Sequence, residues 1–334
     1  MSCRIAVYGA GSWGTAFSLV LADAGCEVTL WGRRQSVVDA INETRRNPDY
    51  VRGAAYLPEA VRATADPAEA ARGAEIVVLA VSAQHVRPLL EEWRESWGPR
   101  TVFLSLMKGV ELATTKLMSE VIAETTGASP DRIAVLSGPN LAREVMLRKP
   151  AASVIACADE STAARIQAAC HTSTFRCYTN TDVIGCELGG AVKNVIALAA
   201  GVCDGMCLGD NTKASLITRG LAEVTRLGVA MGADPLTFAG LAGMGDLVAT
   251  CASALSRNYS FGRRIGSGMT LEETRALAEE TAEGVASCKA VSTLGERHGV
   301  ELPITRAVTG MIHEGRDPQD VMDALMSRAA KAEV

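Results

Sequence analysis

One lysine stands out among the residues that could do chemistry. Lys193 lies in the segment 187–202, in which the only other charged residue is Glu187. Burial lowers the pKa of an ammonium group toward the range useful for proton transfer, because burial disfavours the charged form. The sequence therefore predicts that Lys193 is a catalytic acid or base, and Asn194 beside it is a candidate for orienting the lysine or a substrate. The alternative is a lysine that extends along an apolar surface to water.

Polar residues that could serve this lysine follow later in the chain. Asp246 comes directly after the glycine-rich run 240–245 and is a candidate partner for a lysine or a substrate hydroxyl, with a helix cap as the alternative. The run Ser256-Arg257-Asn258 combines a hydroxyl, a guanidinium and an amide, which together can hold a phosphate. Its alternative is an exposed helix start. These residues predict a phosphorylated alcohol or ketone as the substrate.

A glycine-rich loop near the N-terminus predicts a dinucleotide site. The run Gly9-Ala10-Gly11-Ser12-Trp13-Gly14 follows the apolar segment 4–8 and precedes a helix-like segment that extends to Ala24. Gly9 permits the tight turn, Gly11 lets the backbone approach a pyrophosphate, and Gly14 lets the helix pack closely on the strand. The order of strand, loop and helix favours this fingerprint over its alternative, an ordinary glycine turn.

The end of the second predicted strand indicates which dinucleotide binds. The segment 27–31 leads into Gly32-Arg33-Arg34, where an NAD-binding fold usually carries an acid that bonds the ribose hydroxyls. Two guanidiniums and no carboxylate suit a 2′-phosphate. The sequence therefore favours NADP(H), with NAD(H) possible, and a solvated basic pair is the alternative for Arg33 and Arg34.

Short apolar runs along the first half predict the strands that position these loops. Runs this apolar suit strands that are buried on both faces, as in a doubly wound, Rossmann-like α/β domain with a parallel sheet. Ligands of such a sheet bind beyond the carboxyl ends of its strands, which makes Lys108 and the run Gly138-Pro139-Asn140 candidate site residues. The predicted strands are 4–8, 27–31, 61–64, 76–81, 101–105 and 133–137, with 152–156 and 175–178 extending the sheet.

The second half of the chain has helical character. From about Asp182, alanine, leucine, glycine and methionine dominate, and helices are expected over 187–203, 213–231, 271–277, 286–298 and 318–328. We therefore predict a dinucleotide-binding domain over residues 1–181 and an all-α substrate domain over 182–334. No polar linker separates the two, so the ligand site is expected at a tight junction between them.

Composition excludes several other classes of function. The 334 residues carry a formal net charge of −5 without a dense Lys/Arg stripe, which excludes a nucleic-acid partner. No run approaches the roughly 20 apolar residues of a membrane span and no signal peptide precedes the first strand, so a cytoplasmic location is expected. The ten cysteines and four histidines lack metal-site spacing, so no metal is expected. The apolar helical domain is compatible with a homodimer.

Seven motifs, taken together, resemble the NAD(P)-dependent sn-glycerol-3-phosphate dehydrogenases of the bacterial type, and the resemblance runs from Ile5 to about Ala324. It implies reduction of dihydroxyacetone phosphate to sn-glycerol 3-phosphate for glycerophospholipid synthesis, with Lys193 exchanging the proton of the C2 hydroxyl. The motifs are Gly9-Ala10-Gly11-Ser12-Trp13-Gly14-Thr15-Ala16, Lys108-Gly109, Ser137-Gly138-Pro139, Lys193-Asn194, Gly243-Met244-Gly245-Asp246-Leu247, Leu255-Ser256-Arg257-Asn258 and Ala282-Glu283-Gly284.

The resemblance also implies two sets of binding residues. The residues implied to contact the dinucleotide are Ser12, Trp13, Arg33, Arg34, Lys108, Ala142, Arg257 and Glu283, with Thr281 carried over weakly. The residues implied to surround the substrate are Lys108, Gly138, Asn140, Lys193, Asp246, Ser256, Arg257 and Asn258.

Two departures and two rivals accompany this resemblance. Asn140 stands where many members have Ser or Thr, and Thr281 stands where an aliphatic residue is frequent. The β-hydroxyacid and 6-phosphogluconate dehydrogenases share the overall plan, and the phosphate-holding run 256–258 argues against them. A non-catalytic NADP(H) sensor is the second rival, because a fold by itself does not give a function.

Overall fold

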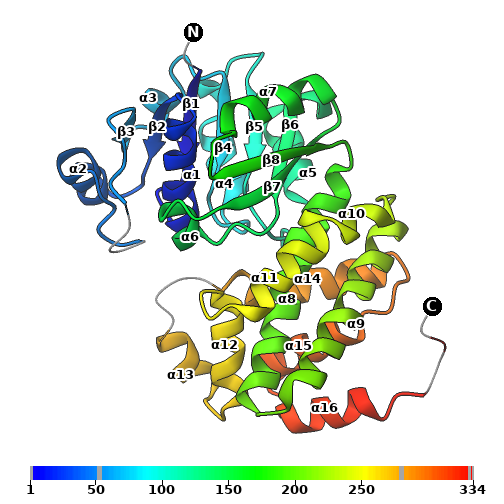
Figure 1. Ribbon diagram of the computed structural model, residues 1–334. Helices are drawn as coiled ribbons and strands as arrows, with labels where there is room; N and C mark the ends of the chain where they lie inside the picture. Colours follow the sequence, from blue (N-terminus) through cyan, green and yellow to red (C-terminus); the bar gives the residue numbers. More distant parts are fainter. Residues whose placement is uncertain (1–2, 51–54, 278–281, 330–331, 333–334) are drawn as a thin grey trace.

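The computed structural model describes residues 3–50, 55–277, 282–329 and 332. A sheet with helices on both faces forms its first part, and a group of helices forms its second part (Figure 1). The strands are β1 (Arg4–Tyr8), β2 (Glu27–Trp31), β3 (Val61–Thr64), β4 (Ile76–Leu79), β5 (Val102–Ser105), β6 (Ile133–Ser137), β7 (Ala151–Cys157) and β8 (Phe175–Asn180).

The sheet has the strand order β3-β2-β1-β4-β5-β6-β7-β8. Strands β1 to β6 are parallel, and the order reverses between β1 and β4, which is where doubly wound sheets bind nucleotides. The expectation of a parallel sheet is wrong for β7, which runs antiparallel to β6 and parallel to β8. The link between β6 and β7, residues 138–150, contains only the short helix α6 (Ala142–Met146).

Alternating side chains along each strand build the two layers of the core. In β1, Ile5 and Val7 pack on one face of the sheet, and Ala6 and Tyr8 pack on the other. All four are at most 2% exposed, as expected for a strand that is covered on both sides. The helices of this part are α1 (Ser12–Asp23), α2 (Gln35–Thr44), α3 (Pro67–Ala71), α4 (Val86–Glu92), α5 (Met118–Thr126), α6 and α7 (Glu160–Cys170), with short 3₁₀ turns η1 (Arg94–Ser96) and η2 (Pro130–Arg132).

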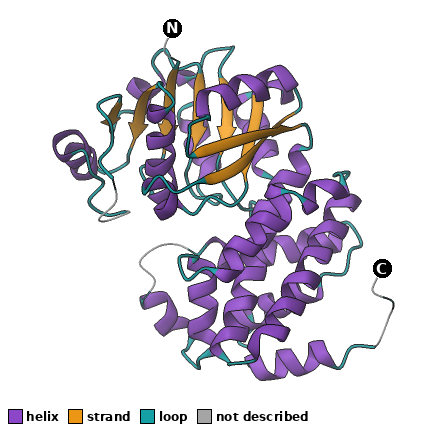
Figure 2. Ribbon diagram, in the orientation of Figure 1, coloured by secondary structure: helices purple, strands orange, loops and turns teal. Residues whose placement is uncertain are grey.

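The helices of the second part surround α8 (Val183–Gly205) (Figure 2). Within the described ranges α8 is long and apolar enough to cross a membrane, with a mean hydropathy of 1.5, but 89% of its apolar window is buried inside the protein. The helix is therefore the centre of this part. Its companions are α9 (Gly209–Ala230), α10 (Pro235–Ala239), the π-helical turn η3 (Leu241–Gly245), α11 (Asp246–Ala252), α12 (Arg257–Gly266), α13 (Leu271–Ala276), α14 (Glu283–Arg297), α15 (Pro303–His313) and α16 (Pro318–Met326).

Helix boundaries explain where the sequence-based expectations fall short. Helix α8 begins four residues before the expected start because the Asp182 side chain accepts a hydrogen bond from the Gly185 N–H, at 2.8 Å. Helix α15 was not among the expected helices, although Pro303 stands at its first position. The division of the chain into domains at residues 181 and 182 stays a prediction.

Close helix packing fixes the approach of α12 to α8. A Cβ placed on Gly201 of α8 would meet the Tyr259 carbonyl oxygen at 2.1 Å, and one on Gly262 of α12 would meet the Leu198 carbonyl oxygen at 2.0 Å. Only glycine fits at such distances, so the two backbones approach each other directly. This contact places the start of α12, with Arg257, near the middle of α8.

Candidate functional site

Lys193 is buried where α8 passes η3 and α11. Its side chain is 8% exposed, and its Nζ forms an ion pair with Asp246 and donates to Thr250 Oγ1 at 2.9 Å. The alternative of a lysine that extends to water is therefore wrong. Thr250 was not predicted, although its spacing of four residues from Asp246 places both side chains on one face of α11.

Asp246 joins two lysines rather than capping a helix. Its Oδ2 accepts a hydrogen bond from Lys108 Nζ at 2.7 Å, while its Oδ1 faces Lys193 Nζ. No side-chain cap hydrogen bond forms at the start of α11, so the cap alternative for Asp246 is wrong. A Cβ on Gly189 of α8 would meet the Ala242 carbonyl oxygen at 2.4 Å, so this approach seats η3 on α8 and brings Asp246 over Lys193. π-Helical turns of this kind occur frequently at functional sites.

Lys108 reaches this pair from the carboxyl end of β5. Its Nζ also donates to the Gly138 carbonyl at 3.1 Å and to Asn140 Oδ1 at 2.9 Å, both in the loop after β6. Asn140 in turn donates to Ser153 Oγ of β7 at 3.1 Å. The structure therefore brings Lys108, Gly138, Asn140, Asp246 and Lys193 together, although their contacts here are with one another.

The charges of this cluster perturb its titration. Burial lowers the pKa of Lys193 to about 7, with Lys108 lowering it further and Asp246 opposing the shift. Burial raises the pKa of Asp246, but the charges of Lys108 and Lys193 outweigh burial and hold it below the usual value. One carboxylate thus faces two ammonium groups, and Lys193 is the buried group that can exchange a proton near neutral pH.

Two asparagines connect the charged residues of the site. Asn194 Nδ2 donates to the Lys108 carbonyl at 3.1 Å, and Asn194 Oδ1 accepts from Asn258 Nδ2 at 3.0 Å. Asn258 Oδ1 accepts from the Gly284 N–H at 2.9 Å. Asn258 therefore links α8, α12 and α14, and its predicted substrate contact stays a prediction.

The start of α12 adds a guanidinium to the site. The Ser256 side chain caps α12 by accepting from the Tyr259 N–H at 3.2 Å. The run 256–258 is therefore a helix start, but Ser256 and Asn258 are buried, so the alternative of an exposed helix start holds only for Arg257. Arg257 is the first residue of α12, and its charge acts on Glu283 at the start of α14. Burial raises the pKa of Glu283, while Ser82, Arg257 and His85 oppose the shift.

The glycine loop has the geometry of a phosphate cradle. Gly9 holds φ +122°, and a Cβ there would meet the Ala80 carbonyl oxygen at 2.4 Å. Strand β4 ends at Leu79, two residues earlier than predicted. A Cβ on Gly14 would meet the Gly9 carbonyl oxygen at 1.9 Å. Around Gly11 a Cβ would meet nothing within 4 Å, so the N-terminus of α1 faces open space without a side-chain cap. Such an N-terminus suits a pyrophosphate.

The remaining predicted cofactor residues lie at the start of α1, after β2 and at the start of α6. Ser12 and Trp13 begin α1, and Trp13 Nε1 is a buried donor that has no hydrogen-bond partner among the described residues. Arg33 and Arg34 follow β2 and are exposed, and Arg34 forms an ion pair with Asp49. Ala142 begins α6, which packs beside α1. Thr281 lies outside the described residues.

One further polar group of the site belongs to a motif of the sequence but was not given a role there. Ser137 Oγ is buried at the end of β6 without a partner among the described residues. A Cβ placed on Gly190 of α8 would lie 2.9 Å from this oxygen and 3.4 Å from Lys108 Cγ. Ser137 therefore lies beside Lys108, which with Asp246 and Lys193 forms the lysine cluster. The described residues contain no group of three or more His, Cys, Asp or Glu side chains that could hold a metal ion.

Comparison with known proteins places the chain in a family. The N-terminal model of the NAD-dependent glycerol-3-phosphate dehydrogenases matches residues 4–163, and the C-terminal model of the same family matches residues 182–323. The chain belongs to this family. It is 64% identical to a glycerol-3-phosphate dehydrogenase of the NAD(P)+ type from Streptomyces griseus over 330 residues, which cover 99% of this chain and 98% of the relative.

Other members of the glycerol-3-phosphate dehydrogenase family extend the likeness. The NAD(P)+-type enzyme from Thermobifida fusca is 58% identical over 331 residues, 99% of this chain and 98% of that protein. The crystal structure of a glycerol-3-phosphate dehydrogenase from Coxiella burnetii superposes with a TM-score of 0.93 at 36% identity, covering 98% of this chain and 99% of that one. The predicted family, the α/β-plus-helical fold and an NAD(P)-dependent oxidoreductase acting on a small phosphorylated compound are confirmed.

Proposed function

We propose that this chain reduces dihydroxyacetone phosphate to sn-glycerol 3-phosphate with NADPH or NADH, and that Lys193 is the catalytic acid. The observation that carries the assignment of Lys193 is its burial against Asp246, with Lys108 on the same carboxylate. A lysine with a pKa of about 7 is half protonated near neutral pH, and it can therefore give a proton in one direction and take it back in the other.

The residues present fit a dinucleotide cofactor. The open space at Gly11, the uncapped start of α1 and the unpaired Trp13 Nε1 leave donors for a pyrophosphate. Gly9, Gly11, Ser12, Trp13 and Gly14 would hold it there. The resemblance adds Ala142, Lys108, Arg257 and Glu283 to these binding residues. The cofactor, when bound, supplies a hydride to the carbonyl carbon of the substrate.

The lysine cluster supplies the proton chemistry. In reduction, Lys193 Nζ donates a proton to the C2 carbonyl oxygen as it becomes a hydroxyl. In oxidation, neutral Lys193 accepts that proton. Asp246 keeps the protonated form accessible inside the protein, and Thr250 accepts a hydrogen bond from Nζ and so fixes its direction.

Cations at the edge of this cluster suit the substrate phosphate. Lys108 follows β5 and bonds Asp246. Arg257 begins α12, and its charge acts on Glu283. Arg257 is suited to a phosphate because its guanidinium can bond two oxygens at once. Ser256 stands beside it at the helix start, where N–H groups also favour an anion.

Two exposed arginines carry the preference for NADP(H). Arg33 and Arg34 follow β2 without a carboxylate between them and the strand. The structure nevertheless brings one carboxylate to these arginines, because Asp49 forms an ion pair with Arg34. A 2′-phosphate has to displace Asp49 from Arg34, whereas NAD(H) does not, so both cofactors are used and NADPH is favoured by the second guanidinium, that of Arg33.

The cellular role follows from the product. sn-Glycerol 3-phosphate is the backbone of glycerophospholipids, so the enzyme supplies their synthesis. A cytoplasmic location and a homodimer built on the helical domain, residues 182–334, are part of the same proposal. They rest on the resemblance and on the apolar character of that domain.

The decisive experiment follows nicotinamide absorbance when the purified protein meets dihydroxyacetone phosphate. NADPH and NADH are tested separately, with unphosphorylated dihydroxyacetone as the control. Lys193→Met should lose turnover by a thousandfold or more while still binding NADPH, and Lys289→Met, a change of an exposed lysine on α14, should keep it. Turnover of the unphosphorylated ketone at an equal rate, or an active Lys193→Met, would overturn the proposal.

A further inference from the structure

The segment between β5 and α5 carries Lys108 and has a built-in shape of its own. We call residues 108–117 the lysine loop. Val110 and Leu117 form an isolated antiparallel bridge, and the Glu111 N–H donates to the Lys116 carbonyl at 3.0 Å. Thr115 holds φ +59° and donates its N–H to the Glu111 carbonyl at 2.8 Å. The loop therefore closes on itself through its own backbone hydrogen bonds.

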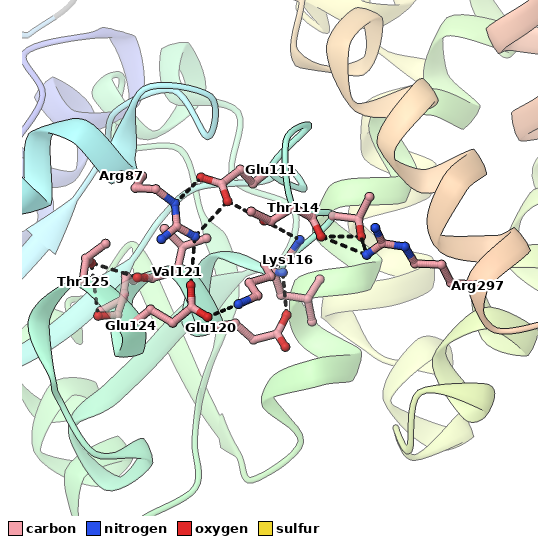
Figure 3. Close-up of polar contacts among 12 residues, drawn as sticks. Arg87, Glu111, Thr114, Lys116, Glu120, Val121, Glu124, Thr125 and Arg297 are labelled. Carbon is pink, nitrogen blue, oxygen red and sulfur yellow. Dashed lines mark hydrogen bonds and ion pairs between the residues drawn. The ribbon is translucent and has the colours of Figure 1, made fainter.

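Two residues of the sheet-containing part fasten the lysine loop. Gln84 Nε2 donates to the Val110 carbonyl at 2.8 Å, and Gln84 Oε1 accepts from the Leu112 N–H at 3.0 Å. Arg87 of α4 bonds both oxygens of Glu111 at 2.9 Å (Figure 3). Glu111 is 7% exposed, and hydrogen bonding to Arg87 holds the pKa of its carboxyl below the usual value. The pair is therefore an ionised, bidentate contact at a partly buried place.

A third contact comes from the helical part. Arg297 at the end of α14 donates from Nη1 to the Thr114 carbonyl at 2.9 Å and to Thr115 Oγ1. Figure 3 shows that Arg297 contacts the loop from the side opposite to Arg87. The lysine loop is thus held between the two parts of the chain, and α14, which begins at Glu283 beside Arg257, ends on it.

The start of the loop has little freedom of its own. A Cβ on Gly109 would meet Ala83 Cβ at 2.8 Å, so Gly109 is pressed against the sheet-containing part. Asn194 holds the Lys108 carbonyl at 3.1 Å, and the Lys108 ammonium ends on Asp246 at 2.7 Å. Lys108 and Gly109 are thus held by both parts of the chain, and residues 110–117 continue directly from them.

We infer that Arg87, Glu111 and Arg297 are positioning residues that hold the lysine loop against both parts of the chain and so keep the Lys108 ammonium beside Asp246 and Lys193. The inference rests on the proposed function of Lys193. We place their effect at Lys108, because none of the three contacts Asp246 or Lys193 in the part of the chain that the structure describes.

The electrostatics of the cluster make this inference measurable. The titratable groups facing Lys193 are Asp246 and Cys251 from α11 and Lys108 from the lysine loop. Asp246 raises the pKa of Lys193 and Lys108 lowers it, while burial raises the pKa of the Cys251 thiol to about 12 and so keeps it neutral. If Lys108 moves away, the pKa of Lys193 rises. The pH limb of turnover that reports Lys193 then shifts to higher pH in both reaction directions.

The test uses the full-length enzyme with Arg297→Met, Arg297→Lys, Arg87→Gln and Lys108→Met. Arg148→Gln is the matched control, because Arg148 forms an equally close bidentate pair with Asp23 on the sheet-containing part. The pH profiles of kcat and kcat/KM for dihydroxyacetone phosphate are measured with saturating NADPH, and thermal unfolding confirms that each variant is folded.

We expect Arg297→Met and Arg87→Gln to lower kcat/KM about tenfold, a loss typical of one charged hydrogen bond, and to shift the limb upward by about half a pH unit. Arg297→Lys should restore both, and Arg148→Gln should change neither. In the double variant of Lys108→Met with Arg297→Met, the loss should not exceed that of Lys108→Met alone, because both changes act through the same group.

Two results distinguish a failure of the proposed titration of Lys193 from a failure of the positioning role. A limb that stays in place in Lys108→Met refutes the proposed titration of Lys193 itself. A limb that shifts in Lys108→Met but stays in place in the folded Arg297→Met and Arg87→Gln variants, or a fully additive double variant, overturns the positioning role.

Discussion

Asp246→Asn tests the electrostatic core of the proposed mechanism. The change removes the carboxylate between Lys108 and Lys193 and keeps the size and shape of the side chain. Asp246 is 1% exposed and raises the pKa of Lys193, which burial has lowered to about 7. An opposite charge at this range shifts a pKa by about 1–3 units, so the pKa of Lys193 should fall to about 6 or lower.

The expected loss of rate follows from the protonated fraction of Lys193. At pH 7.5 a group with a pKa of about 7 is roughly one quarter protonated, and at a pKa of about 6 it is roughly one thirtieth protonated. Reduction at pH 7.5 should therefore fall by about eightfold or more from protonation alone, whereas at pH 5 a pKa of about 6 leaves roughly nine tenths of Lys193 protonated and costs almost nothing. Oxidation needs neutral Lys193. The part of its pH profile that reports the pKa of Lys193 should therefore also shift to lower pH.

The assay is the pH profile of kcat/KM for dihydroxyacetone phosphate between pH 5 and 9. Breaking a buried ion pair costs about 3–5 kcal/mol, so unfolding is measured in parallel and NADPH binding confirms that the cofactor site is intact. Asp204→Asn is the matched control, because Asp204 also faces two cations, Lys213 and Arg263, but near the surface. A folded Asp246→Asn enzyme whose limb stays at the wild-type pH would refute the reasoning.

Three further predictions concern the cofactor, the loop and the fold. Arg33→Asp with Arg34→Ala should move the ratio of kcat/KM for NADPH and NADH at least tenfold toward NADH, and an unchanged ratio would place the preference elsewhere. Gly14→Ala should weaken NADPH binding at least tenfold in a fluorescence titration, because its Cβ would meet the Gly9 carbonyl oxygen at 1.9 Å; retained affinity would contradict the packing argument. Burial raises the pKa of Glu223 to about 7, so its protonated form stabilises the fold below pH 4.5, and that contribution is lost as pH rises through 7. In denaturant unfolding, the stability of the wild type relative to Glu223→Gln should therefore fall by up to about 3 kcal/mol between pH 5 and 8, and a constant difference would count against a buried acid there.

Local sequence was sufficient for most of the sheet. Strands β1, β2, β3 and β6 have the predicted bounds because each is a short run rich in apolar or β-branched residues. The direction of β7 was not predictable in this way, since an apolar run reads the same in both directions. Its antiparallel pairing with β6 is seen only in the folded structure.

The glycine-rich segments also show what local sequence can predict and what it cannot. Gly9 and Gly14 were assigned their roles from spacing, and the structure gives both the close contacts that those roles require. The glycine-rich run before Asp246 would by composition let a ligand approach the backbone closely. A Cβ on Gly243 would meet the Phe238 carbonyl oxygen at 2.1 Å, so that glycine serves packing instead.

The sequence by itself determined the residue types of the chemistry: a lone lysine in an apolar helix, an aspartate after glycines and an arginine at a helix start. Tertiary structure decided their partners. Lys108 and Asp246 are 138 residues apart in the chain, and Lys193 and Asp246 are 53 apart. No local pattern encodes that one carboxylate serves both ammonium groups, because the contact exists only where α8, η3 and the end of β5 meet. The pKa of Lys193 is likewise a property of that burial, since water screens the same side chain in the unfolded chain.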